Sequence, residues 1–194
     1  FKTKQLRVNT PLQKFIPSDA IEWKAGFRKQ LFIIVPLWII AASTSFFIGS
    51  VPIAIFILGI LTSGYFEYCE SYQMLLAYEL SAKKLLRLKA MRQIQLFSIL
   101  AVPLIALFLL FHSNIWYVPV AEFLIFCFLG VYAVMTKYAF FEPNTKSPAA
   151  QTFLSIGVLG GLIPIFLPVV GLLTIRFYNK SVNHLNFLLD DYDT

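Results

Sequence analysis

The sequence predicts an all-α protein, a polytopic helical bundle of an integral membrane protein. Hydrophobic residues make up 58% of the 194 residues and charged residues 13%, and the mean hydropathy is +0.73. A soluble domain carries about 25% charged residues, because its surface must stay hydrated. The charged residues here are also clustered between long apolar runs, and a run of about 20 apolar residues is long enough to cross a bilayer. The lipid bilayer is therefore the first partner that the composition implies.

The apolar runs divide the chain into a lead with an amphipathic interfacial helix (residues 1–30), a transmembrane domain (31–178) and a cytoplasmic tail (179–194). We expect four full spans and a fifth, Pro- and Gly-broken hydrophobic segment. Their approximate bounds are 31–48, 52–66, 96–111, 115–141 and 149–177. A basic connection, 67–95, separates the second span from the third.

The lead ends in a pattern typical of a helix in the headgroup layer. Trp23, Phe27 and Leu31 recur at four-residue spacing, with basic residues on the other faces. An aromatic stripe beside cations suits an interfacial helix, here over residues 19–30. Asp19 and Glu22 have the spacing of a capping box at its start. The alternative is that these residues form only the cytoplasmic end of the first span.

The basic connection determines the predicted orientation. It contains five of the sixteen basic residues, and Glu67 and Glu70 lie at its start. Lys and Arg in short loops are retained on the cytoplasmic side, so we expect this connection and the N-terminus to be cytoplasmic, with the bacterial inner membrane as the expected location. The formal charge of +6 is then explained by topology and by anionic lipid headgroups, without a nucleic-acid partner. From Ser81 onward, leucines alternate with cations as in a short basic amphipathic helix.

The remaining spans follow from the distribution of charge. The turns at residues 49–52 and 112–114 contain no Lys or Arg and are expected outside, whereas Lys137 marks the inner end of the fourth span. The fifth segment is interrupted by glycines and prolines. It either turns back near residues 161–168 and keeps Arg176 and Lys180 inside, which we favour, or crosses once. A broken backbone at membrane depth needs protein or water around it.

No catalytic constellation is present in the sequence. There is no phosphate-binding GxxxxGK[ST] loop, no GxSxG, no HExxH and no CxxC, so we expect no enzyme activity, no cofactor and no metal site. Cys69 and Cys127 have the setting of buried small hydrophobic residues. Any ATP hydrolysis would belong to a partner chain.

Two intramembrane polar candidates remain, Glu122 and His112. Glu122 is the one acid inside an apolar run, and an ionisable group there usually faces the bundle interior or water. It either contacts a substrate, a proton or a partner helix, or it is a carboxyl near the outer interface bonded to a hydroxyl or to His112. Glu67 and Glu70 are expected to pair with cations of the basic connection, Lys83, Lys84 or Arg87.

The phrase ESYQMLLAYELSAKKLLRLKAMRQ, between two pairs of spans, resembles the charged cytoplasmic connection of ABC-2-type export permeases. The layout of an entry helix, two spans, this connection, two spans and a short final pair is also similar to that family's membrane domain. The resemblance implies a permease half that pairs with itself or a similar chain. A separate cytoplasmic ATPase would dock on residues 72–95 and drive a lipid, glycan or peptide across the membrane.

The docking candidates on that connection are Glu79, Lys83, Lys84, Arg87, Lys89 and Arg92. They would transmit motion by changing contacts, without chemistry. The competing hypothesis is a non-catalytic structural or assembly subunit of a larger membrane complex, which would use the same basic helix and the tail. An intramembrane enzyme acting on lipids is disfavoured, because too few ionisable groups are expected to converge.

Overall fold

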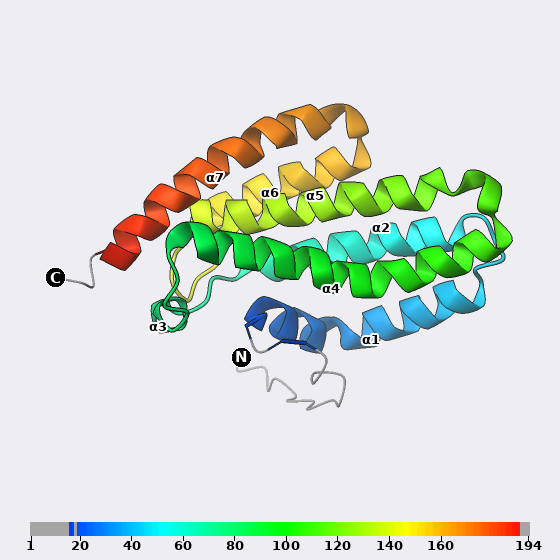
Figure 1. Ribbon diagram of the computed structural model, residues 1–194, viewed down its shortest axis with the longest axis horizontal. Helices are drawn as coiled ribbons and strands as arrows, with labels where there is room; N and C mark the ends of the chain where they lie inside the picture. Colours follow the sequence, from blue (N-terminus) through cyan, green and yellow to red (C-terminus); the bar gives the residue numbers. More distant parts are fainter. Residues whose placement is uncertain (1–15, 18, 191–194) are drawn as a thin grey trace.

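The computed structural model describes residues 16–17 and 19–190, and every regular element in that part of the chain is helical. Figure 1 shows α1 (Ile21–Ser43), α2 (Ser50–Ser63), α4 (Ala82–Phe111) and α5 (Tyr117–Ala139) side by side along the long axis. The short helix η2 (Gly64–Glu67) extends α2. Within the part of the chain that the structure describes, four stretches are long and apolar enough to cross a membrane: Ile21–Ser43, Ser50–Glu67, Ala82–Phe111 and Tyr117–Ala139. The predicted all-helical class is confirmed to that extent.

The separate interfacial helix is not observed, because α1 is one continuous helix that includes Pro36. Its N-terminal flank is Ala20, with no capping side chain. The predicted capping box is therefore wrong, and Asp19 and Glu22 have other partners described below. The helix also ends earlier than predicted, at Ser43, and residues 44–49 form the turn into α2.

The basic connection is partly the beginning of the third long helix. After α3 (Tyr72–Leu76), whose first turn is capped by the Ser71 side chain, the chain turns through Glu79 at a positive φ of 48°. The short helix predicted from Ser81 does not stop before the third span. It continues without a break to Phe111 as α4, whose 30 residues extend about 45 Å at 1.5 Å per residue.

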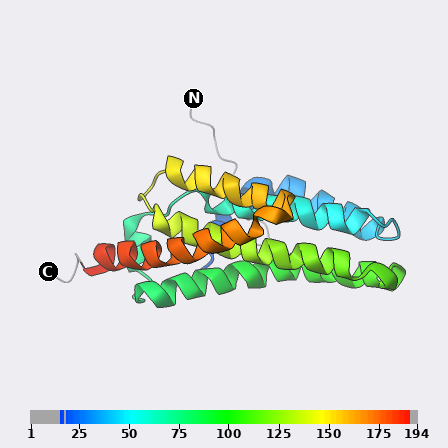
Figure 2. The ribbon, with the colours of Figure 1, turned by 90° about the horizontal axis from the view of Figure 1, so that it is seen from above.

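The fifth hydrophobic segment is a helical hairpin in the structure. α6 (Pro148–Leu162) is followed by the short helix η4 (Pro164–Phe166) and by α7 (Leu167–Asp190), which returns along α5. In Figures 1 and 2 the turn of this hairpin lies short of the bundle end where α1 meets α2 and α4 meets α5. A Cβ atom on Gly160 would lie 2.7 Å from Cγ2 of Val170, so glycine permits the close approach of the two arms.

The outer surface of the bundle is apolar over much of its length. The exposed fraction is 77% for Phe32 on α1 and for Leu110 on α4, and 61% for Leu124 on α5. Aromatic rings fill the interior instead, including Phe97, Phe108 and Phe126. Large apolar side chains pointing outward are expected where lipid is the solvent.

Candidate functional site

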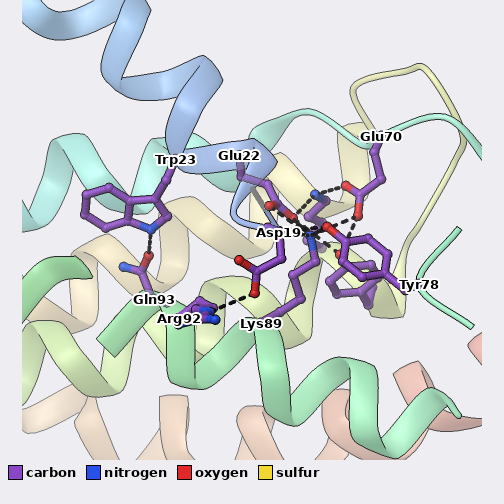
Figure 3. Close-up of polar contacts among 10 residues, drawn as sticks. Asp19, Glu22, Trp23, Glu70, Tyr78, Lys89, Arg92 and Gln93 are labelled. Atoms are coloured by element: carbon purple, nitrogen blue, oxygen red, sulfur yellow. Dashed lines mark hydrogen bonds and ion pairs between the residues drawn. The ribbon is translucent and has the colours of Figure 1, made fainter. Parts of the chain in front are cut away.

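The most distinctive polar feature of the described chain is a group of ionised side chains inside the bundle, which we call the buried charge cluster. Five segments supply it: the residues at and just before the start of α1, the loop between η2 and α3, the turn after α3, the N-terminal part of α4 and the C-terminal end of α5. Figure 3 shows these side chains converging between the helices. The members are Asp19, Glu22, Glu70, Lys89, Arg92 and Lys137, with the hydroxyls of Tyr78 and Tyr138.

Glu22 is the point at which α1, α4 and α5 meet. The Nζ atom of Lys89 donates to both carboxylate oxygens of Glu22, at 3.0 Å each. The Nζ atom of Lys137 donates to Oε1 of the same carboxylate at 2.9 Å. Lys137 is fully buried and Lys89 is 3% exposed. Charge-assisted hydrogen bonds of this kind are stronger than neutral ones, so Glu22 ties two helices to the first.

Glu70 joins the loop to the same cluster. Lys137 and the hydroxyl of Tyr138 both donate to its carboxylate. The Nζ atom of Lys89 lies 3.8 Å from Glu70 Oε1. The backbone holds this loop as well, since Asn144 N–H donates to the carbonyl of Glu70 at 3.3 Å. The loop before α3 is therefore attached to α5 through side chains and to the α5–α6 loop through its backbone.

A second layer of contacts surrounds the ammonium groups. Arg92 Nε donates to Asp19 Oδ2 at 2.7 Å. The Tyr78 hydroxyl accepts from Lys89 at 3.0 Å and donates to the carbonyl of Asp19 at 2.7 Å. Beside these contacts, Trp23 Nε1 on α1 donates to Gln93 Oε1 on α4 at 2.6 Å. Tyr78, in the turn after α3, is thus linked to Asp19, just before α1, both directly and through Lys89 of α4.

The cluster is electrically balanced, with three carboxylates opposite three cations. A buried charge is tolerated when it is paired and hydrogen-bonded, and becomes costly when a partner is removed. Because each carboxylate already has a cation, the cluster has the character of a structural joint between segments. Among the described residues, no group of three or more His, Cys, Asp or Glu side chains could hold a metal ion.

Four of the six docking candidates are exposed, Arg92 is partly exposed and Lys89 is buried. Glu79, Lys83, Lys84 and Arg87 are exposed where α3 turns into α4, and we call residues 72–87 the α3–α4 corner. Lys89 points inward to Glu22, and Arg92 pairs with Asp19. Residues 83, 84 and 87 lie on the outer face of α4 and residue 89 on its inner face, and the sequence pattern did not separate them. Lys89 is therefore not accessible at the surface as the pattern suggested, and the docking role of the other candidates stays a prediction.

The other polar candidates are separate from the cluster. Glu122 is half-buried on α5, and its Oε2 atom has no hydrogen-bond partner among the described residues. The bond to His112, one of the alternatives considered, is not observed, and the Nε2 atom of His112 lies 2.9 Å from the carbonyl oxygen of Phe46. That contact joins the two turns at the far end of the bundle.

The pairing predicted for Glu67 and Glu70 is also wrong in its partners. Lys146 Nζ donates to Glu67 Oε2 at 2.8 Å, and this hydrogen bond raises the pKa of Lys146. Glu70 pairs with Lys137 and Lys89 rather than with Lys83, Lys84 or Arg87. The convergence of ionisable groups was underestimated, because residues 19, 22, 70, 89, 92 and 137 are far apart in the sequence.

Cys69 is buried, as predicted, whereas Cys127 is only partly buried. Both thiols are free. Burial raises the pKa of the Cys69 thiol. Predictions on residues 1–15 and 191–194, which include two of the acidic residues of the tail, lie outside the described residues. Comparison of the chain with protein-family models, with curated proteins and with solved structures finds no match.

Proposed function

We propose that this chain is a multi-pass membrane subunit of permease type, which moves a lipid, glycan or peptide across the bacterial inner membrane with a separate cytoplasmic ATPase. Four helices long and apolar enough to cross a membrane support the membrane part of the proposal. The layout that resembles ABC-2-type permeases supports the transport part. In this proposal the N-terminus and the α3–α4 corner are cytoplasmic, and the chain pairs with itself or with a similar chain.

The observation that carries the proposal is the combination of an exposed corner with a buried connection to the spans. The corner presents Lys83, Lys84 and Arg87, which are exposed and have no ion pair within the described part of the chain. Exposed cations at the end of a bundle favour a partner with a complementary acidic surface, because matched charges steer association.

Hydrogen bonds connect the α3–α4 corner to the buried charge cluster. Tyr78, in the turn after α3, accepts a hydrogen bond from Lys89, and Lys89 binds Glu22 on α1. The same carboxylate binds Lys137 on α5. A displacement of the corner would therefore act on α1 and α5 through changed contacts. The only chemistry required, ATP hydrolysis, would take place in the partner.

The decisive experiment compares two double variants of the full-length chain purified in nanodiscs with its associated proteins. Lys83→Glu/Arg87→Glu reverses two charges on the corner, and Arg28→Glu/Arg176→Glu reverses two exposed charges elsewhere. We expect a P-loop ATPase to purify with the wild-type chain in a fixed ratio. The corner variant should lose at least tenfold of the bound ATPase activity, whereas the control variant should keep it.

Two results would contradict the proposal in different ways. An ATPase that stays bound to the corner variant would place the dock elsewhere on the chain. The absence of any ATPase from the wild-type preparation would favour the second candidate, a non-catalytic structural or assembly subunit. That candidate has its own support in the complete pairing of the buried charge cluster, since matched buried ions favour a single packed arrangement.

A further inference from the structure

A groove of about 410 Å³ runs along the outer side of α4, near the start of α1. Pro17 forms one wall, and the rest is a face of α4 from Arg92 to Ile99. Leu96 is buried and forms the floor, while Ile99 is 64% exposed. The groove thus has a polar end at Arg92 and an apolar end that opens toward the apolar surface of the bundle.

The polarity of this face follows a helical repeat. Lys84, Leu88, Arg92, Gln95 and Ile99 recur at intervals of four, four, three and four residues, which places them on one side of α4. The stripe is about 22 Å long at 1.5 Å per residue. Its polar end is the exposed ammonium group of Lys84. The Arg92 guanidinium and the Gln95 amide follow, and the apolar end is the side chain of Ile99. A ligand that matches it has an anionic head and an apolar tail.

Hydrogen-bond donors remain available at the polar end. Arg92 uses Nε for Asp19 and Nη1 for Gln95 Oε1, at 2.7 and 3.0 Å, and its Nη2 has no partner among the described residues. Because Gln95 accepts through its oxygen, its amide N–H groups are still free to donate. Asp19 neutralises part of the Arg92 charge, so the net attraction for an anion comes from Lys84 and its neighbours Lys83 and Arg87.

We propose that this groove binds one anionic glycerophospholipid, with the phosphate at Arg92 and Gln95 and an acyl chain along Ile94 to Ile99. An inorganic phosphate has no apolar part to contact the apolar end of the groove, whereas the acyl chain of a membrane lipid can pack against Ile94 and Ile99 while its headgroup reaches Arg92. The lipid would stabilise the junction between α1 and α4, because Arg92 is already bonded to the residue that precedes α1. The inference rests on the membrane placement proposed above, but it requires neither an ATPase nor transport.

The test measures thermal unfolding of the full-length chain in detergent, together with lipid retention by native mass spectrometry. The probes are phosphatidylglycerol, phosphatidylcholine with the same acyl chains, and inorganic phosphate. We expect phosphatidylglycerol to raise the unfolding midpoint and to be retained as one molecule per chain. Lys84→Gln should weaken its affinity about fivefold, the effect of one cation at a lipid surface.

A groove-filling variant tests the site without touching the ionic contacts. Ser98→Phe places a ring in the groove, and Ser155→Phe is a matched control on α6, since both serine hydroxyls donate only to a backbone carbonyl four residues earlier. Ser98→Phe should lower phosphatidylglycerol affinity at least tenfold, and Ser155→Phe should leave it unchanged. An unchanged affinity in Ser98→Phe would overturn the proposal.

Three further outcomes would also overturn it. Equal stabilisation by phosphatidylcholine would show that the anionic head is not recognised. An equal shift with inorganic phosphate would assign the site to a soluble anion. Tighter phosphatidylglycerol binding after removal of residues 1–15 would show that the chain's own lead occupies the groove.

Discussion

Replacing Lys137 by Met tests whether the buried charge cluster holds the bundle together. Lys137 is fully buried and donates to both Glu22 and Glu70. Without it, Glu22, Glu70 and Asp19 face only Lys89 and Arg92, so one buried negative charge has no cation. Breaking a buried ion pair by removing one partner costs about 3–5 kcal/mol. We expect Lys137→Met to lower the free energy of unfolding by an amount in this range.

A double-mutant cycle separates lost pairing from lost packing. Glu70→Gln in the Lys137→Met background restores a neutral cluster, because Glu22 then faces Lys89 and Asp19 faces Arg92. The double variant should therefore be more stable than the sum of the two single losses predicts, with a coupling of about 2 kcal/mol. The unfolding free energies would be measured by denaturant titration in mixed micelles, with Lys83→Met, at an exposed lysine, as the control that changes stability by less than about 0.5 kcal/mol.

The reasoning fails on either of two results. A cost below about 1 kcal/mol for Lys137→Met would mean that water reaches the site and that the charges are not desolvated. Additive losses in the cycle, within about 0.5 kcal/mol, would mean that Lys137 and Glu70 do not interact in the folded protein.

Three further predictions concern topology, packing and thiol reactivity. Cysteines introduced at the exposed positions Lys83 and Asn183 should react with an impermeant maleimide only after the membrane is opened. A cysteine at exposed Ser113 should react in intact cells. The opposite pattern would reverse the proposed orientation. Gly59→Ala should lower the unfolding free energy by about 1–3 kcal/mol, because the new methyl group would overlap the ring of Phe126, whereas Gly49→Ala, with its nearest neighbour at 3.6 Å, should change little. Burial raises the pKa of the Cys69 thiol, so at pH 7 it should react with maleimide more slowly than an exposed cysteine at position 113 and gain rate as the pH rises; equal rates at pH 7 would contradict its burial.

The all-helical class and the apolar segments were predictable because lipid imposes length and composition on each crossing helix. The end of α4 at Phe111 was predictable from the polar turn that follows it. The helical hairpin after residue 148 was predictable from its run of Gly and Pro. Helix starts were less predictable. Ser81 has the character of an N-cap, but nothing local shows that the helix after it continues through residues 93–96 into the next span.

The buried charge cluster was not predictable from local pattern. Lys83, Lys84, Arg87 and Lys89 look alike in the sequence, yet only Lys89 faces the interior. Lys137 has the position of a cation that marks the inner end of a span, and Glu22 that of a capping residue. The positions of the two residues together do carry a signal. Glu22 lies at the start of α1 and Lys137 at the end of α5, and in antiparallel spans these two helix ends lie on the same side of the membrane, where the side chains can pair.

The ion pairs of the buried charge cluster also bear on the predicted orientation in the membrane. Lys89 and Lys137 are buried, Arg92 is partly exposed, and each is paired with a carboxylate, so the three contribute little net charge to this end of the bundle. The asymmetry persists without them. Lys83, Lys84 and Arg87 remain exposed on the corner, whereas the connections 44–49 and 112–116, joined at the opposite end through His112 and Phe46, contain no Lys, Arg, Asp or Glu. The positive-inside rule counts basic residues near span ends, and here the exposed residues alone favour a cytoplasmic corner.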